Sequence, residues 1–403
     1  MTEIAITGMG AVAATGIGTD ALWAACRDGI DAIGPLELKR PCKLRVNRAA
    51  QVRDFDPLAY LDKSLLSRCD RFSQFAHVAA AEAIAQSGLE PEEVAGPRTA
   101  VIVGTGVGGF NALDDGHYLH YVEDRRVDPM GIPRQMPSSA ASHISMIHGT
   151  TGPCFAVSSA CASASQSIGT GALLIRAGLA DRAIVGGAEA ATTPVAMRAW
   201  ETMRVLTPDF CRPFSMGRSG MVIGEGAGLF VIERADAAKA RGARPLAMLS
   251  GYGTTSDARD VLQPDMDGAA AAMTLALADA GLGPDAIDYV NAHGTGTVLN
   301  DRNEAGALRM VFGNLIDAIP VSSSKPIFGH GLGAGGALEL VVAVNALREG
   351  IVPPQINFLE ADPACPLYLP TDGPIATPLR AVLSNSFAFG GINASLVVTH
   401  PDA

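Results

Sequence analysis

The sequence is poor in aromatic residues and in charge. Phe, Trp and Tyr make up 5% of its 403 residues, and Asp, Glu, Lys and Arg together make up 18%. Acidic side chains outnumber basic ones, which gives a formal net charge of −11. This balance argues against general nucleic-acid binding, because such binding needs a basic face. It leaves room for a local basic patch that meets an acidic partner.

Cysteine pairs, leader segments and long apolar runs are also missing. The seven cysteines are odd in number and form no Cys-x-x-Cys pair, which indicates free thiols in a reducing compartment. The first residues lack a basic region and predict a strand instead of a signal peptide. No apolar run is long enough to cross a bilayer. We therefore expect a cytoplasmic protein without a membrane span.

Small and apolar residues are abundant. Hydrophobic residues make up 48% of the chain, and 45 glycines are dispersed along it without a period. This composition favours a layered α/β protein over a helical bundle. The periodicity predicts strands over 4–7, 99–103, 182–189, 245–251, 286–292 and 321–324, and helices over 72–87, 165–177, 269–280 and 335–347. Thr19-Asp20 is expected to cap a further helix, and residues 111–128 show no clean helix.

Two distant segments share one pattern. Residues 219–233 and 383–399 each predict a strand, a Gly-rich turn and a second strand. We infer an internal duplication, with an N-terminal half over 1–250 and a C-terminal half over 251–403. Each half has a central helix that follows a turn of small residues, and halves placed back to back would bring the two helix starts together.

Cys161 lies in a run of small residues just before the helix predicted in the first half. The run reads Ala156-Val157-Ser158-Ser159-Ala160-Cys161-Ala162-Ser163-Ala164-Ser165. The start of a helix favours a thiolate, and small neighbours leave space for a substrate to reach the sulfur. The alternative is a buried cysteine that packs as a small hydrophobic residue.

Two histidines lie in Gly-rich turns of the second half. His293 belongs to the segment Asn291-Ala292-His293-Gly294-Thr295-Gly296-Thr297, and His330 belongs to the segment 324–336, just before a helix. An imidazole N–H group can stabilise an oxyanion, and a cysteine can hold an acyl group as a thioester. Together these residues suit acyl transfer followed by chemistry at a carbonyl. Singly, each histidine would more simply be a hydrogen-bonded structural residue.

A Gly-rich run and a histidine pair suggest other kinds of site. Gly104 to Gly109 matches Gly-x-Gly-x-x-Gly after a strand, the pattern of a dinucleotide loop, although no clear βαβ unit surrounds it. We favour a tight turn near a substrate pocket. His117 and His120 could form half of a metal site, but no third ligand lies nearby, so we predict surface histidines and no metal.

The Cys161 run, the two histidine segments and residues 385–393 resemble the active-site motifs of the β-ketoacyl-[acyl-carrier-protein] synthases of the elongating Cys-His-His class. The resemblance covers nearly the full length of the chain, including the opening residues 6–10. It implies a thiolase-like α/β fold, with two duplicated βαβαβαββ halves in five α-β-α-β-α layers.

The resemblance also implies a reaction, a decarboxylating Claisen condensation. A Cys161-bound acyl chain would react with malonyl-acyl carrier protein to give β-ketoacyl-acyl carrier protein, in fatty acid or polyketide-type elongation. His293 and His330 would support decarboxylation, and Lys325 would orient the histidine region. The N–H groups of Cys161 and Phe389 would form the oxyanion hole. No cofactor is implied, since the phosphopantetheine arrives on the carrier protein.

Other family positions match substrate contacts. The hydroxyl groups that hold the pantetheine arm match Thr295 and Thr297, a pocket-lining aliphatic residue matches Val107, the gate segment contains Phe387 and Phe389, and Glu339 would pair near Lys325. For Lys325 and Glu339 the alternative is a buried structural ion pair.

The expected partner is an acyl carrier protein, which is acidic and needs a local basic rim on an acidic enzyme. The basic positions that match the family's docking surface are Arg68, Arg125, Arg126 and Arg204, with Lys63 and Arg71 nearby. Taken singly, each is more simply a solvated charge. The resemblance further implies a homodimer or a heterodimer with a related subunit.

Several residues depart from the family pattern. Ala388 stands where glycine is usual, Ile392 where threonine is usual, and Ser219 and Met221 replace Asp and Phe. These changes favour a specialised synthase over a housekeeping one, with Ala388 stiffening or retuning the gate.

Other functions compete with this reading. One alternative is a silent chain-length partner of a heterodimeric ketosynthase, which Cys161 argues against. Another is a thiolase acting on CoA esters, which would carry a second cysteine near the C-terminus. A nucleotide-dependent oxidoreductase would rest on the Gly-rich run alone, and a pure carrier-protein-binding module would require a blocked pocket.

Overall fold

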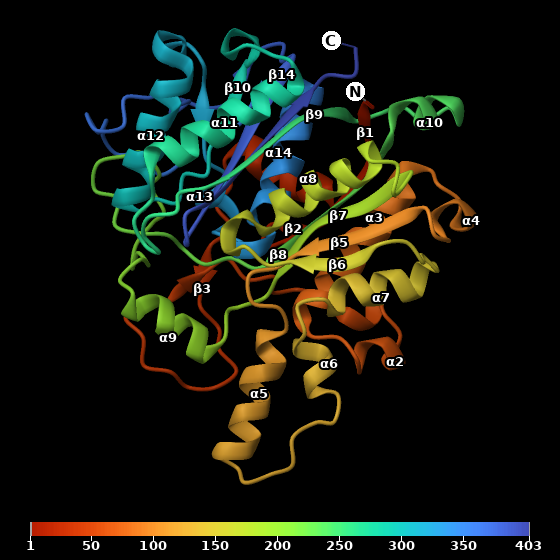
Figure 1. Cartoon of the computed structure of the whole chain (residues 1–403). Helices are drawn as coiled ribbons and strands as arrows, with labels where there is room; N and C mark the ends of the chain where they lie inside the picture. Colours follow the sequence, from red (N-terminus) through yellow and green to blue (C-terminus); the bar gives the residue numbers. More distant parts are fainter. Residues whose placement is uncertain (1, 403) are drawn as a thin grey trace.

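One mixed sheet path runs through the whole protein. The structure is a computed structural model that describes residues 2–402. The strands follow one another in space in the order β11-β10-β14-β15-β9-β1-β8-β7-β5-β6, with β2 beside β1 (Figure 1). Their bounds are β1 Ile4–Ala13, β2 Gly16–Ile17, β5 Thr99–Gly104, β6 Cys154–Val157, β7 Arg182–Glu189, β8 Gly226–Arg234, β9 Ala247–Ser256, β10 Tyr289–Asn291, β11 Val321–Ser322, β14 Ala381–Ala388 and β15 Ile392–Thr399.

The strand order shows the duplication directly. Outward from the centre, β1-β8-β7-β5-β6 and β9-β15-β14-β10-β11 each contain two antiparallel and then two parallel pairings. The two halves join where β1 meets β9 over only two residue pairs, Ala5 with Met248 and Ile6 with Ala247. The thiolase-like duplicated fold is therefore confirmed. The predicted division after residue 250 lies within β9 and stays a prediction.

Two short ladders and the helices complete the chain. The ladders pair β3 Gly34–Pro35 with β4 Arg48–Ala49, and β12 Ile351–Val352 with β13 Ile375–Ala376. The α-helices are α1 Thr19–Asp28, α2 Lys63–Leu66, α3 Arg71–Ser87, α4 Pro91–Val94, α5 Phe110–Tyr121, α6 Gly131–Gln135, α7 Ser139–His148, α8 Ser163–Arg176, α9 Pro194–Thr202, α10 Ala235–Ala240, α11 Met266–Ala280, α12 Val298–Phe312, α13 Lys325–Phe328 and α14 Gly335–Glu349. The 3-10 turns are η1 Pro57–Ala59, η2 Ala160–Ala162, η3 Pro284–Ala286, η4 Gly313–Asp317 and η5 Leu332–Ala334. No helix of residues 2–402 is both long and apolar enough to cross a bilayer.

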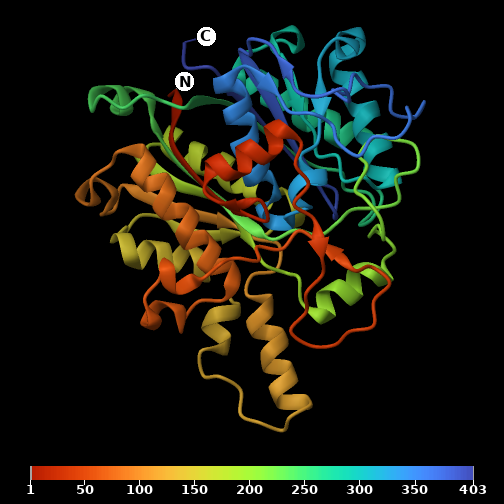
Figure 2. The same cartoon turned by 180° about the vertical axis from the view of Figure 1, so that it is seen from behind.

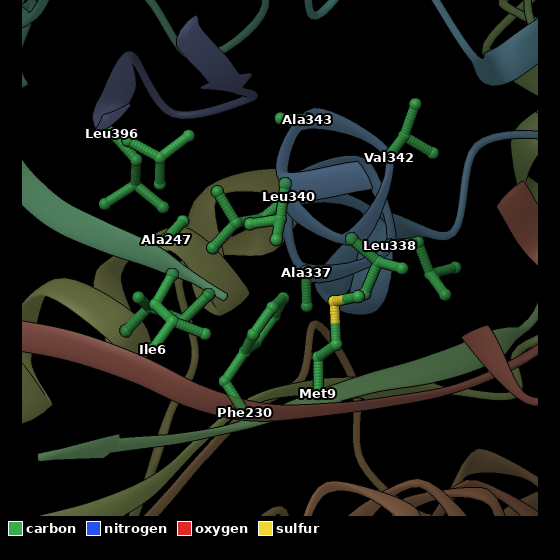
Figure 3. Packing of buried hydrophobic residues seen from close by; sticks show 14 of the residues in the cluster. Ile6, Met9, Phe230, Ala247, Ala337, Leu338, Leu340, Val342, Ala343 and Leu396 are labelled. Atoms are coloured by element: carbon green, nitrogen blue, oxygen red, sulfur yellow. The ribbon is translucent and has the colours of Figure 1, made fainter. Parts of the chain in front are cut away.

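The helices form layers on both faces of the sheet halves. Helices α8 and α14 contact each other and lie at the centre of the molecule, α3 and α7 cover the N-terminal half, and α11 and α12 cover the C-terminal half (Figures 1 and 2). Helix α14 is buried from Gly335 to Leu347, as expected for a helix enclosed between two sheets. Its Ala337 and Leu340 pack in one cluster with Met9 and Phe230 of the strands (Figure 3).

Glycine in β1 lets helix α3 lie directly on the sheet. A Cβ atom at Gly8 would lie 1.9 Å from the Ala83 oxygen, and one at Gly10 would lie 2.0 Å from the Ala79 oxygen. Interiors packed this closely leave no room for a methyl group. The helix predicted over 72–87 is confirmed as α3, and it ends at Gly88 in the left-handed conformation.

Three local predictions are wrong. Residues 110–121 form helix α5, which has no fully buried residue and hence no apolar stripe; ion pairs from Arg40 to Asp114 and Asp115 hold it instead. The segment before Gly226 makes only isolated bridges, so 219–233 contains one strand, not two. Helix α1 begins after Gly18, and Thr19 donates its hydroxyl to Glu82 without capping the helix.

Candidate active site

Cys161 lies in a tight turn at the start of the central helix of the first half. It belongs to η2, directly before α8, and is 5% exposed. Ala160 adopts φ 48°, an unusual conformation for a residue with a side chain. The Ser163 hydroxyl fixes this turn, because it donates to the Ala160 oxygen at 2.7 Å and accepts from the Ser159 N–H at 2.9 Å. The thiol is thus held where strand, turn and helix meet.

His330 reaches Cys161 from the corresponding turn of the second half. Its Nε2 lies 3.0 Å from the Cys161 sulfur. Its backbone is anchored on the 219–225 segment, since the His330 N–H donates to the Val222 oxygen at 2.7 Å. The Leu332 N–H donates to Nδ1 of His330 at 3.3 Å, so the proton of the neutral ring sits on Nε2 and faces the sulfur.

His293 completes the triad from the end of β10. Its ring lies 5.3 Å from that of His330, centroid to centroid, at an interplanar angle of 82°. The Cys161 sulfur and one ring nitrogen of each histidine all lie within 4.8 Å of one another. The three residues predicted from distant motifs are therefore brought together.

Lys325 and Glu339 form a buried ion pair beside His293. The buried ammonium group of Lys325 donates to Nδ1 of His293 at 3.3 Å, to the His293 carbonyl oxygen and to the Glu339 carboxylate. Because an ammonium group only donates, Nδ1 of His293 accepts and the proton of its neutral ring sits on Nε2. Both histidines therefore present an Nε2–H group. The Lys325–Glu339 ion pair exists as predicted, and its carboxylate does not line the pocket.

Burial decides the protonation states. It holds the pKa values of His293 and His330 well below the usual range, and the nearby Lys325 charge lowers both further, so both rings are neutral. Burial raises the pKa of the Cys161 thiol to about 12, whereas Lys325 and a backbone hydrogen bond from Phe389 lower it. The thiol is therefore protonated in the resting pocket, with a backbone donor and an imidazole donor beside it.

The pocket above Cys161 has a volume of about 350 Å³. His293, His330, Phe387 and Phe389 line it close to the sulfur. Thr295 and Thr297 also line it, and their hydroxyl groups lie 2.9 Å apart. The other lining residues are Met203, Arg204, Val205, Ser219, Gly220, Met221, Val261, Leu262, Gln263, Pro264, Val298, Leu299, Asn300, Ala388, Gly391 and Asn393.

Some predicted positions lie outside this pocket. Val107 does not line it and is 41% exposed on the single chain. Arg204 lines the pocket, whereas four basic residues lie exposed elsewhere, around α2 and beyond the end of α5; they are Lys63, Arg68, Arg125 and Arg126. Arg125 pairs with Glu123 at 2.9 Å.

Arg71, placed near the basic docking positions, is half-buried. Its guanidinium group pairs with Glu225 at 2.8 Å, so its charge is already used inside the protein.

Two buried carboxylates were missed by the sequence reasoning. Glu189, at the end of β7, accepts from the Thr105 hydroxyl, the Gly106 N–H and the Gly333 N–H. Glu304 of α12 accepts from the N–H groups of His293 and Gly294, both at 2.8 Å. Burial raises the pKa of each to about 7. A charged residue at the end of an apolar strand was the only available signal for Glu189.

The Gly-rich run over residues 104–109 belongs to the hydrogen-bond network around Glu189. The Gly106 N–H, which a phosphate would need in a nucleotide loop, donates to the Glu189 carboxylate at 2.6 Å. Among the described residues, neither His117 nor His120 belongs to a group of three potential metal ligands. The geometry instead favours a cysteine nucleophile with two imidazole donors.

Sequence comparison identifies the family. The model of the beta-ketoacyl synthase N-terminal domain matches residues 1–238, and that of the beta-ketoacyl synthase C-terminal domain matches residues 246–359. The chain belongs to the beta-ketoacyl synthase family. The predicted resemblance is thereby confirmed, and the chain is an enzyme of this family.

Known proteins resemble the chain over almost its whole length. Nodulation protein E of Rhizobium sp. (strain N33) is 42% identical over 397 residues, 98% of either chain. The 3-oxoacyl-[acyl-carrier-protein] synthase 2 of Staphylococcus aureus (strain COL) is 36% identical over 403 residues, 98% of this chain and 97% of that protein. The solved ishigamide ketosynthase/chain length factor superposes with a TM-score of 0.95 at 32% identity, over 99% of both chains. The set indicates a specialised synthase.

Proposed function

We propose that the chain condenses an acyl group held on Cys161 with malonyl-acyl carrier protein and releases a β-ketoacyl-acyl carrier protein and carbon dioxide. One observation carries this proposal: the Cys161 sulfur faces the Nε2–H group of a neutral His330 at 3.0 Å, with a neutral His293 beside it. A nucleophile next to two neutral donors suits thioester exchange followed by enolate formation.

The first step is acyl transfer to Cys161. The sulfur attacks the thioester carbonyl carbon, while the Cys161 and Phe389 N–H groups stabilise the oxyanion. The carrier's sulfur leaves, and the thiol proton goes to it, so a free carrier thiol departs and no net charge stays in the pocket. The backbone hydrogen bond of Phe389 toward the resting sulfur supports its part in this step.

The second step is decarboxylation and condensation. The Nε2–H groups of His293 and His330 donate to the thioester oxygen of the malonyl group, which favours loss of carbon dioxide and stabilises the enolate. The enolate carbon attacks the acyl-cysteine carbonyl, the Cys161 thiolate leaves, and a proton from solvent restores the thiol. Lys325 orients His293 through Nδ1, and Thr295 and Thr297 hold the pantetheine arm.

The two halves contribute different parts of this chemistry. In our assignment, residues 1–250 supply the nucleophile and residues 251–403 supply the histidines. No cofactor is required, because the phosphopantetheine arrives with its carrier.

The substrate is an acyl chain of a specialised pathway. Higher identity to Nodulation protein E than to the synthase 2 of Staphylococcus aureus supports this assignment, as do Ala388 and Met221 in the pocket wall. Arg204 lies at the pocket and would receive the carrier protein there. Four further basic residues would contribute if a second subunit brings them near a pocket mouth; they are Lys63, Arg68, Arg125 and Arg126.

Such a second subunit has a natural place at β6. This strand ends the sheet, and Phe155 on it is exposed, as are Met146 and Ile147 of α7. An open strand edge with apolar neighbours favours pairing with another chain. We propose a dimer through this edge, with itself or with a related subunit, and a cytoplasmic location.

The test is reconstitution with purified carrier proteins. Acyl- and malonyl-acyl carrier protein should give a β-ketoacyl product and carbon dioxide, both measured by mass spectrometry. Release of carbon dioxide should fall in His293→Ala and in His330→Ala, while His117→Ala, on exposed α5, should retain it. Condensation of CoA esters but not of carrier-bound chains would contradict the proposal and favour a thiolase.

A further inference from the structure

A second group of a cysteine and two histidines lies in the helical layer over the N-terminal half. Cys69 precedes α3, His77 lies two turns into α3, and His143 lies in the middle of α7. All three are buried, with exposures of 4%, 4% and 7%. One ligand atom of each lies within 4.8 Å of those of the other two. The catalytic triad uses none of these residues.

The contacts inside this group leave one nitrogen without a partner. The Cys69 sulfur lies 3.3 Å from Nδ1 of His143, and the rings of His77 and His143 stack at 5.9 Å with an interplanar angle of 20°. Nε2 of His77 is buried and has no hydrogen-bond partner among residues 2–402. A buried polar atom without a partner costs about 1–3 kcal/mol, so an imidazole with such an atom in a group of three potential ligands requires a reason.

We propose that Cys69, His77 and His143 bind a zinc ion. A thiolate and two imidazoles are ligands that zinc prefers, at about 2.3 Å for sulfur and about 2.0–2.1 Å for nitrogen. Ligand atoms in a tetrahedron of this size are separated by about 3.3–3.6 Å. The Cys69 sulfur and Nδ1 of His143 already lie 3.3 Å apart, and the other two separations, each at most 4.8 Å, would shorten on binding. The Cys69 thiol gives its proton to solvent, the sulfur and the two nitrogens each bind zinc, and a water molecule takes the fourth position.

The surroundings would let the ion link the segment before α3 and α3 itself to α7. The Ser73 and Ser139 hydroxyl groups bond at 2.9 Å and already hold α3 against α7 in the same layer. Burial raises the pKa of the Cys69 thiol to about 12, while the charges of Arg134 and Arg68 act in the opposite direction and favour the thiolate that zinc would bind. The ion would join the segment before α3 to α7, from which the chain runs through β6 to the Cys161 turn. Zinc should therefore stabilise the folded chain.

The experiment must separate this group from the catalytic triad, which also offers a thiol and two imidazoles. All measurements therefore use the full chain in a Cys161→Ala background. Cobalt(II), a spectroscopic substitute for zinc, is titrated into metal-free protein, and zinc affinity is measured by competition with a chelator. We expect one ion per chain, a thiolate-to-cobalt absorption band in the near ultraviolet, and a higher melting temperature with zinc.

Three variants decide the outcome. Cys69→Ser should abolish the absorption band, and His77→Gln should weaken zinc binding at least tenfold. Cys154→Ser, which removes an exposed cysteine outside the group, should change neither. If serine disturbs the packing, Cys69→Ala replaces it, with circular dichroism as the folding control. An absent band with Cys69 intact, or equal zinc affinity after its removal, would overturn the proposal.

Discussion

The two halves of the molecule place the same turn at the same point and use it differently. In the first half, Ala160 has φ 48° and is followed by Cys161 and α8; in the second, Leu332 has φ 47° and is followed by Gly333 and α14. Turn η2 packs against β14, and turn η5 packs against the equivalent strand β7. Gly333 thus stands where the nucleophile stands in the other half.

The neighbours of the two turns explain the difference. The Gly333 N–H donates to Glu189 at 3.0 Å, and a Cβ atom there would lie 2.2 Å from the Gly106 nitrogen. Cys161 instead faces a pocket with room for a substrate. One copy of the turn is therefore filled by a carboxylate and backbone, and the other is left open. A duplicated fold supplies two equivalent positions, and packing decides which one reacts.

The largest expected effect comes from a change in the turn that holds Cys161, η2, which faces the open pocket. Cys161→Ala should lower the condensation rate by at least about 10³-fold, because Cys161 is the one thiol among the described residues that line the pocket. The folded state should be retained, since alanine fills the buried position without a polar atom. The rate is measured with acyl- and malonyl-carrier protein, and Cys42→Ala, at a free cysteine outside the pocket lining, serves as the control. A variant rate within tenfold of the wild type would remove the proposed role of Cys161.

The next largest effect is expected in the turn that holds Gly333, η5, which Glu189 and backbone atoms fill. Gly333→Ala should destabilise the chain by about 2 kcal/mol or more, because its methyl group would overlap the backbone of the Gly104 to Gly109 run. Gly116→Ala in α5, where nothing lies within 4 Å of the added Cβ atom, should instead be neutral or stabilising by up to about 1 kcal/mol. Urea unfolding measures both. Equal stability of the two variants would show that the turn is not tightly packed.

Glu189→Gln is a finer test of the filled turn. The substitution replaces one acceptor oxygen by an amide donor, which then faces groups that are themselves donors: the Thr105 hydroxyl and the N–H groups of Gly106 and Gly333. It should lower the free energy of unfolding by about 1–3 kcal/mol. Burial raises the pKa of Glu189 to about 7 in the folded chain, whereas the same carboxyl group in the unfolded chain has its ordinary pKa of about 4.5. Between these two pH values the folded chain holds a proton that the unfolded chain has released. Stability should therefore fall as the pH rises through this window, by at most about 1.4 kcal/mol per pH unit for this group.

Glu304 provides the comparison for that pH dependence. Burial also raises its pKa to about 7, so Glu304 adds an effect of the same sign in the wild type, beside those of other buried carboxyl groups such as Asp70 and Asp301. Glu189→Gln should remove one of these contributions and leave that of Glu304, measured by urea unfolding at several pH values. An unchanged slope in the variant would show that Glu189 is ionised throughout the window.

The smallest effect is expected at the gate. Ala388 pairs with Ile392 at the end of the β14–β15 hairpin and has no positive φ, whereas Gly390 and Gly391 do. Glycine at position 388 is therefore not required by this conformation. Ala388→Gly should cost about 0.5–1 kcal/mol through chain entropy alone. A loss of several kcal/mol in urea unfolding would contradict this, and a gain in acylation rate would show that alanine restrains the gate.

The sequence predicted what depends on local pattern. The likeness of residues 219–233 to 383–399 led to the duplication, although only the part from Gly226 onward is a strand in the first segment. The small-residue turns before α8 and α14 and the Gly-rich turn around His293 indicated the triad. Helix α5 was missed because charged contacts, not an apolar face, hold it. Glu189 and Glu304 were missed because their partners are backbone N–H groups from distant segments, which no spacing in the sequence records.

Several predicted positions do not gather at the pocket of the single chain. Val107 was expected in the pocket and lies exposed, and four of the five predicted docking residues lie away from the pocket mouth. If a second subunit pairs with β6, these residues belong to a surface that two chains build together. Sequence motifs identify such residues, whereas the single chain does not bring them to one place.

The most direct test of the account is to locate the acyl group. The full chain is incubated with acyl-carrier protein alone, and intact mass and peptide mapping follow the adduct. The account predicts one acyl group per chain, on Cys161 and on none of the other six cysteines. An adduct on another residue, or the same adduct in Cys161→Ala, would contradict the claim that the open turn is the reactive one.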